Sequence, residues 1–212
     1  MPCWRMHIAA GEKLNENLKF TGHARDEFLL GCLLPDVNNG YINQVKVRKH
    51  HAETHWRFDD KMSWNFLKAH RAEIEAREPI FVGYFFHLFM DGYFNRNFAR
   101  MAHERGVDKG MSEDDLRFMK QWDFRKYDWE LRRNVVFATA NKKDAVAKAN
   151  LIDTVEIDLE DLADVESVLA DRHFGEAMEH LEYRFFTREE ISDLMNGVVV
   201  QFFEEAPFLL ED

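Results

Sequence analysis

Two residues near the middle of the chain have the types and spacing of a pair of metal ligands. His87 and Asp91 stand four residues apart in FVGYFFHLFMDGYF, a segment that is otherwise aromatic and aliphatic. In a helix, side chains four residues apart point to the same side, about one turn apart. A carboxylate in such surroundings needs a strong partner, because an unpaired buried charge is very costly. The segment therefore predicts a buried ion held by both residues.

Two interpretations without a metal remain open for the same pair. In one, the neutral imidazole of His87 donates a hydrogen bond to the Asp91 carboxylate. In the other, the carboxylate forms an ion pair with Arg96 or Arg100, which follow in the same segment. Either arrangement would satisfy the carboxylate within the protein alone.

Three further candidate ligands precede this pair and also have apolar neighbours. His7 lies beside IAA, Asp36 follows the apolar segment LLGCLLP, and His55 is followed by a tryptophan. A carboxylate at the end of an apolar helix is unfavourable unless a cation lies nearby, because that end carries partial negative charge. A core histidine and a turn or cap aspartate are ordinary roles when each is taken singly. The set as a whole is what indicates a metal site.

The segment KHHAETHW contains two more imidazoles, His50 and His51. If the segment is helical, His51 and His55 have the spacing of two ligands and His50 points elsewhere. His51 is therefore a possible additional ligand. The alternative for both His50 and His51 is a solvated polar stretch.

The combined candidates are three imidazoles and two carboxylates: His7, Asp36, His55, His87 and Asp91. Nitrogen and oxygen ligands without a thiolate suit zinc, manganese, iron or nickel better than a cysteine-type structural zinc site. We expect one or two divalent metal ions, zinc before the others, since carboxylates can bridge two ions. A bound ion lowers the pKa of a water molecule and polarises a phosphoryl oxygen. The expected chemistry is hydrolysis of a small phosphorylated substrate, with Asp59 or Asp60 orienting the water.

The elements that must position these residues are helices, and the sequence predicts an all-α, single-domain multi-helix bundle over residues 1–212. A first helix is expected over 7–18. A second, FLLGCLL, is expected to be capped by Asp26 and to stop near Pro35, because proline clashes with the preceding turn. The Asn- and Gly-rich stretch 37–47 is expected to be a loop.

A third helix is expected from a Ser63 cap through Ile74. Pro79 suits the first turn of the next helix, where its missing N–H has no cost. That helix is apolar on nearly every side through Met90, which predicts that it forms the buried centre of the bundle.

In the second half, two capping-box patterns predict helix starts: Ser112 with Asp115, and Thr187 with Glu190. The stretch 141–144 (NKKD) is the best loop candidate. No internal repeat or low-complexity linker divides the chain.

The segment 155–159 alternates between apolar and acidic residues. It could form a short strand or lead into a helix that covers Leu162, Val165 and Leu169. We favour the helix.

The composition limits the partners of such a domain. The chain has 212 residues with 28 basic and 39 acidic side chains, which give a formal net charge of −11. A charge of this sign repels nucleic-acid backbones and anionic lipid surfaces at long range. We therefore expect neither a nucleic-acid polymer nor a membrane as partner. Local basic groups could still bind one phosphate.

The same features predict a cytoplasmic protein. Cys3 and Cys32 are far apart and outside any CxxC pattern, so two reduced thiols are expected. The N-terminus has no basic stretch followed by an apolar run, and no signal peptide is expected. The longest apolar run, 80–90, is too short to span a bilayer. The oligomeric state stays open.

Four of these motifs, taken in order, resemble the zinc-dependent phospholipase C family, a helical group related to P1-type nucleases. They are an early-helix histidine (His7), the G-x-L-x-P-D element in GCLLPD (Asp36), the aromatic-flanked histidine of THWRFDD (His55), and GYFFHLFMD. The resemblance runs from the N-terminus to about Asn97, a little under half of the chain. It implies a phospholipase C/P1 nuclease-like fold.

The resemblance also implies a division of the ligands between metal ions. One metal would be held by four residues: Asp36, His55, His87 and Asp91. His7 would hold another metal, with Asp91 shared between the two.

The chain departs from the family at two places. Secreted members use the amine and carbonyl of an N-terminal tryptophan as ligands, whereas Trp4 is internal here. They also carry a histidine a few residues after the HxxxD aspartate, where this chain has Asn95 and Asn97. His103 could substitute, as could the set His173, Glu176 and His180, which also fits an exposed helix face. One or two metals are therefore expected rather than three.

Two functions follow from these residues. The first is a metal-dependent hydrolase of a phosphoester; phospholipid is not favoured, since the charge is negative and no interfacial helix is evident. The second is a non-catalytic metal-binding protein with a structural or sensing role, which a closed coordination sphere would indicate. A core hydrogen-bond network without any metal is the remaining interpretation.

Overall fold

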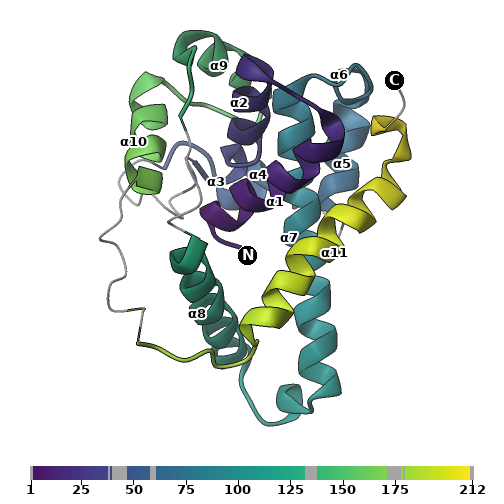
Figure 1. The fold of residues 1–212 in the computed structure, drawn as a ribbon, viewed down its shortest axis with the longest axis vertical. Coiled ribbons are helices and arrows are strands. Elements are labelled where there is room, and N and C mark those ends of the chain that lie inside the picture. Colours follow the sequence, from purple (N-terminus) through teal and green to yellow (C-terminus); the bar gives the residue numbers. More distant parts are fainter. Residues whose placement is uncertain are drawn as a thin grey trace.

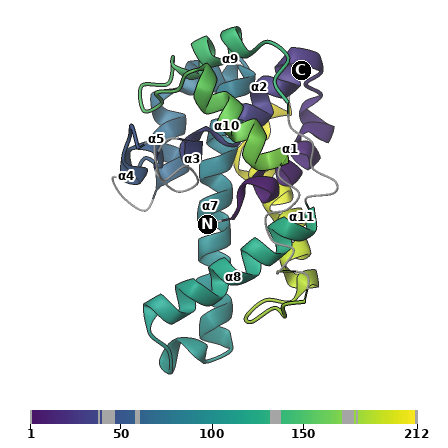
Figure 2. The same ribbon diagram turned by 90° about the vertical axis from the view of Figure 1, so that its left-hand side faces the viewer.

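The computed structural model describes residues 2–37, 39, 47–57, 61–131, 138–170, 178 and 180–210, and these residues fold mainly into helices (Figures 1 and 2). In chain order the described α-helices are α1 (Trp4–Leu18), α2 (Gly22–Gly31), α3 (Leu34–Val37), α4 (His51–Thr54), α5 (Met62–Ala69), α6 (Arg71–Glu75), α7 (Pro79–Glu104), α8 (Glu113–Leu131), α9 (Lys142–Ala149), α10 (Leu159–Ala170) and α11 (Arg188–Glu205). Two short 3-10 helices, η1 (Val107–Lys109) and η3 (Pro207–Leu209), accompany them.

The prediction of an all-α fold is confirmed. Within the described ranges the only β-type pairing is one isolated antiparallel bridge between Asn39 and Val47. No helix in those ranges is long and apolar enough to cross a membrane.

Helix α7 is the centre of the bundle, as predicted. It has Pro79 in its first turn and extends over 26 residues to Glu104. Every residue from 80 to 91 is buried, which requires apolar side chains around the whole circumference. α1, α2, α5 and α11 pack against it. It runs along the length of the molecule, with α8 beside its C-terminal half (Figures 1 and 2).

Two glycines let α2 approach α7 more closely than side chains would allow. A Cβ atom on Gly83 would lie 2.1 Å from the backbone oxygen of Phe28, and one on Gly31 would lie 2.3 Å from a backbone oxygen of α7. The two helix backbones are therefore in direct contact. As a result the carbonyl oxygen of Cys32, which follows α2, lies 2.8 Å from Nδ1 of His87.

The starts of the first two helices differ from the prediction. α1 begins at Trp4, before His7. α2 begins at Gly22 with Thr21 as its N-cap, so the prediction of Asp26 as the cap was wrong and Asp26 lies inside the helix. Gly22 has a φ of 55°, a conformation that glycine adopts without strain, so the chain can turn directly into α2 at this point. α2 ends before Pro35, as predicted.

The helix predicted from Ser63 to Ile74 is two helices, α5 and α6. Lys61 is the N-cap of α5, which places Ser63 in the first turn instead of at the cap. The break falls at His70, whose φ of −119° and ψ of 34° are not helical. The His70 ring packs against Phe66 with the ring centroids 4.6 Å apart. Aromatic packing around this imidazole therefore overrides a continuous helix.

The prediction of a loop over 141–144 was wrong, because this stretch forms the start of α9. Asn141 is the N-cap residue, and its side chain donates a hydrogen bond to Asp144. Ala145 and Ala149, four residues apart, are buried. Their apolar face explains the helix, and the polar residues form its exposed first turn.

The other predicted starts in the second half are confirmed. Thr187 and Glu190 form a complete capping box at α11. The hydroxyl of Ser112 accepts a hydrogen bond of 3.2 Å from the N–H of Asp115 at the start of α8. Residues 155–158 carry no strand and lead into α10, as favoured.

A buried ion pair fixes the start of α1, in the same helical turn as His7. The Asp128 carboxylate of α8 accepts hydrogen bonds from the backbone N–H of Arg5 at 2.7 Å and from its guanidinium at 3.0 Å. The same guanidinium donates to the carbonyls of Val168 and Leu169 in α10. Because loss of one partner would leave a buried charge unpaired, this pair holds three helices in one arrangement.

Replacement of Gly83 by alanine is expected to destabilise the protein by about 1–3 kcal/mol, because the methyl group must push α2 away from α7. Gly92→Ala in the same helix is the matched control: its Cβ would meet only the end of the Arg96 side chain, at 3.1 Å, and it gains the same helix propensity. Urea denaturation measures the free energy of unfolding of both variants. A Gly83→Ala protein as stable as Gly92→Ala would contradict the close packing of α2 on α7.

Candidate metal centre

The five candidate ligands come together in the interior of the bundle. His7 is on α1, Asp36 on α3, His55 directly follows α4, and His87 and Asp91 are on α7. None of the five side chains has any exposed surface. They form two groups of three whose ligand atoms lie within 4.8 Å of one another: His7, His87 and Asp91, and Asp36, His55 and His87.

The Asp91 carboxylate is the hub of these contacts. Its Oδ1 lies 3.5 Å from Nε2 of His7, and its Oδ2 lies 3.4 Å from Nε2 of His55 and 3.9 Å from Nε2 of His87. Nε2 of His55 is also 3.5 Å from Oδ1 of Asp36 and 3.4 Å from Nε2 of His87. The two oxygens of Asp91 thus face different histidines.

Backbone carbonyls orient two of the imidazoles. Nδ1 of His87 donates to the Cys32 carbonyl at 2.8 Å, and Nδ1 of His55 donates to the His51 carbonyl at 3.1 Å. With the proton on Nδ1, each ring presents the lone pair of Nε2 to the centre of the cluster. A carbonyl that fixes the tautomer in this way is the usual support of a metal-binding histidine.

Several polar atoms of the cluster have no hydrogen-bond partner among the described residues. They are Nδ1 and Nε2 of His7, Oδ2 of Asp36, and both oxygens of Asp91. Buried polar atoms are satisfied in the great majority of cases, so these oxygens are free to act as ligands of a cation. A tetrahedral ion with bonds of about 2.0–2.1 Å holds its ligand atoms about 3.4 Å apart. The observed separations of 3.4–3.5 Å fit such an ion.

The geometry disfavours both interpretations of Asp91 without a metal. Within the described ranges, the nitrogen atoms in ion-pair range of its carboxylate belong to His7, His55 and His87. Arg100 instead binds Glu104. The 3.9 Å separation of His87 and Asp91 is too long for a hydrogen bond.

Burial and the contacts within the cluster shift the pKa values of three of its members. Desolvation and the neighbouring His7 hold the pKa of His87 well below its usual value, which keeps its ring neutral. Desolvation raises the pKa of Asp36 despite the opposing effect of His55. Desolvation also acts to raise the pKa of Asp91, but its contacts with His55 and His7 bring that pKa well below the usual value. The lowered pKa of Asp91 favours its ionised form, whereas the raised pKa of Asp36 favours its protonated form.

His51 lies beside the cluster and is outside both ligand groups. Its ring stacks on that of His55 with centroids 3.8 Å apart and planes 9° apart, and its carbonyl orients that ring. His51 therefore orients the candidate ligand His55 and is not itself among the ligands that the geometry groups together. His50 is exposed.

Two of the remaining sequence candidates are described, and both lie outside the two ligand groups. His103 pairs with Asp108 near the far end of α7, and His180 is exposed. His173 and Glu176 lie outside the described residues, as do the two candidates for orienting a water, Asp59 and Asp60.

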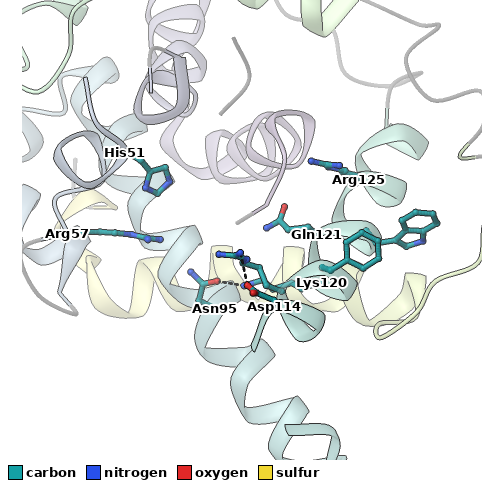
Figure 3. A pocket seen from close by; sticks show the side chains of 10 residues that line it. His51, Arg57, Asn95, Asp114, Lys120, Gln121 and Arg125 are labelled. Atoms are coloured by element: carbon teal, nitrogen blue, oxygen red, sulfur yellow. Dashed lines mark hydrogen bonds and ion pairs between the residues drawn. The ribbon is translucent and has the colours of Figure 1, made fainter. Parts of the chain in front are cut away.

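Sequence reasoning missed a basic cleft beside the cluster, with a volume of about 730 Å³ (Figure 3). Arg117, Lys120 and Arg125 of α8 contribute to it. Lys120 and Arg125 follow Arg117 by three and eight residues, which places the three cations on one face of a helix, and the sequence contained this pattern. The sequence did not indicate which other elements pack beside that face.

The chain matches no protein-family model, no curated protein and no solved structure. The resemblance to the phospholipase C family therefore rests on its four short motifs.

His87→Ala and Asp91→Asn are each expected to abolish stoichiometric metal binding, because each removes a ligand from the centre of the cluster. His50→Ala removes an exposed imidazole from the same region and should keep the metal content of the wild type. Elemental analysis of the purified variants measures this, with circular dichroism to confirm that each is folded. Equal metal content in all three variants would exclude the cluster as the binding site.

The metal-free protein is expected to lose stability as the pH falls from 7.5 to 6. Desolvation and His7 lower the pKa of His87, and desolvation and His55 lower that of His51 to about 3, from a usual value of 6.5. The unfolded chain therefore binds more protons below about pH 6.5 than the folded chain, and protonation favours unfolding.

The raised pKa of Asp36 acts in the opposite direction, because the folded chain then holds a proton that the unfolded chain releases. The free energy of unfolding is therefore measured by urea denaturation in both the wild type and Asp36→Asn. A value that is unchanged or higher at pH 6 in Asp36→Asn would refute the assignment of neutral buried imidazoles.

Proposed function

We propose that this chain is a metal-dependent hydrolase that acts on a phosphoester of a small phosphorylated molecule. One observation carries the proposal: three imidazoles and two carboxylates meet in the core, and three of the four carboxylate oxygens have no hydrogen-bond partner among the described residues. Zinc is the ion we propose first, with manganese, iron or nickel as alternatives, because every ligand atom is nitrogen or oxygen. One ion or two could be held, since the Asp91 oxygens face different histidines.

The ion would supply an activated water and polarise a phosphoryl oxygen. The residues of the chain would do the rest. The two carboxylates, Asp36 and Asp91, balance the charge of the ion, and the carbonyls of Cys32 and His51 keep two imidazoles in the tautomer that binds it. Without these supports the ligands would have to reorganise at each encounter with the ion.

A phosphoester is proposed as substrate on two grounds. The motifs resemble those of the zinc-dependent phospholipase C family, whose fold we also propose for this chain. The basic cleft beside the cluster supplies cations to an anionic substrate in a protein of net charge −11. The two cysteines are unpaired, which supports a cytoplasmic location as part of the proposal.

A non-catalytic metal-binding protein is the second candidate, and burial favours it. All five ligand side chains have an exposed fraction of zero. A metal ion surrounded on every side serves structure or sensing, because catalysis requires one open position.

The two candidates are separated by activity measurements on protein with a known metal content. After elemental analysis, the protein is assayed with a chromogenic phosphodiester and a chromogenic phosphomonoester, with each metal restored in turn. We expect stoichiometric metal and hydrolysis of at least one substrate that His87→Ala abolishes. Bound metal with both substrates inert would favour the non-catalytic role, and absence of metal would refute the proposal.

A further inference from the structure

The basic cleft lies between α4 and α8, with α7 along its floor (Figure 3). In that view His51 and Arg57 stand on one side, Gln121 and Arg125 on the other, and Asn95 and Lys120 between them. The remaining lining residues, Asp114, Arg117, Phe118 and Trp122, also come from α8. Segments more than 50 residues apart in sequence thus build one cavity.

The charge of the lining is opposite to that of the whole chain. Arg57, Arg117, Lys120 and Arg125 are cationic, and Asp114 is the acidic residue among the described lining residues. A net positive cleft in a chain of formal charge −11 would focus anions at this place, while the surrounding surface repels them.

Three of these cations, Arg117, Lys120 and Arg125, differ in how far neighbouring residues compensate their charge. The ammonium group of Lys120 donates to the side-chain oxygen of Asn95 at 2.9 Å and lies 4.9 Å from the centre of the Phe98 ring. Arg117 pairs with Asp114 at 2.8 Å. Within the described ranges Arg125 has no carboxylate in ion-pair range. An anion in the cleft would therefore meet cations that the protein has not already neutralised.

The cleft lies against the metal centre. The ring of His51 lines the cleft and stacks on the ligand His55 at 3.8 Å. Asn95 lines it from one helical turn beyond the ligand Asp91 on α7, a rise of about 6 Å. The cleft and the ligand His55 are thus separated by the ring of His51 alone.

We propose that the cleft binds a second phosphate group of the substrate, separate from the phosphoester that reacts at the metal centre. Guanidinium groups match the oxygens of a phosphate in a planar, bidentate arrangement, and several cations suit a group that carries about two negative charges. The proposal that the cleft binds an anion depends only on the residues of the cleft. The proposal that this anion is part of the substrate rests on the proposed function.

The anion site is tested by calorimetric titration with inorganic phosphate, on protein as purified and after metal has been removed with a chelator. Arg125→Gln and Arg117→Gln should each weaken phosphate binding by about tenfold, as expected for loss of one charge-assisted hydrogen bond. Arg100→Gln is the matched control, because Arg100 is also exposed and ion-paired, with Glu104 on α7. It should change the affinity less than about twofold, as expected of a surface ion pair.

The proposal is overturned if phosphate does not bind, if binding vanishes with the metal, or if Arg100→Gln weakens it as much as Arg125→Gln. None of these results would refute metal binding or phosphoester hydrolysis by the chain. Conversely, an inert protein whose phosphate affinity falls in Arg125→Gln would keep the anion site and refute the proposed function.

The specificity of an active enzyme gives a second test. Hydrolysis of hexyl phosphate is compared with that of 1,6-hexanediol bisphosphate, which adds only a second phosphate group. Arg125→Gln should raise KM about tenfold for the bisphosphate, leave its kcat unchanged, and leave both constants unchanged for hexyl phosphate. An equal effect on both substrates would contradict a site for a second phosphate.

Discussion

The ionised carboxylate of Asp91 is held in the centre of a helix bundle, and within the described ranges the nitrogen atoms in its reach belong to three imidazoles. Neither of its oxygens has a hydrogen-bond partner there. The carboxyl group of Asp36 lies in the same buried cluster, and burial raises its pKa. Uncompensated charge at such a place is among the most expensive features a core can contain. One divalent cation would satisfy both carboxylates and the lone pairs of the imidazoles together, which is why we propose that the cluster holds a metal ion.

Three features of the fold position the cluster and its surroundings. The close contact at Gly31 and Gly83 seats α2 on α7 and delivers a carbonyl to the ring of His87. The buried pair of Arg5 with a carboxylate of α8 fixes the turn of α1 that carries His7. The part of helix α8 that precedes this anchor lines the basic cleft next to the cluster. Ligands from four separate segments form two groups, each with its ligand atoms within 4.8 Å of one another, and these contacts limit the freedom of the helices that carry them.

Part of the fold and of the candidate site could be predicted from sequence patterns within single segments. The apolar circumference and leading proline of α7 were sufficient to place His87 and Asp91 in the core, and the two capping boxes marked helix starts correctly. The interruption at His70 was missed because it depends on aromatic rings contributed by other segments. The alanine face of α9 was missed because the polar residues at its start resemble a loop. The α2–α7 contact and the cleft could not be predicted, because each depends on how segments far apart in the sequence pack together and not on the pattern within a single segment.

The central claim is that a metal ion occupies the space between these five side chains. Anomalous diffraction from crystals of the purified protein, recorded on both sides of the absorption edge of the metal found by elemental analysis, tests it most directly. The account predicts an anomalous peak about 2.0–2.2 Å from Nε2 of His87 and from a carboxylate oxygen of Asp91. Crystals without a peak, in which water molecules or direct hydrogen bonds satisfy both carboxylates, would contradict it and leave a polar core network in its place.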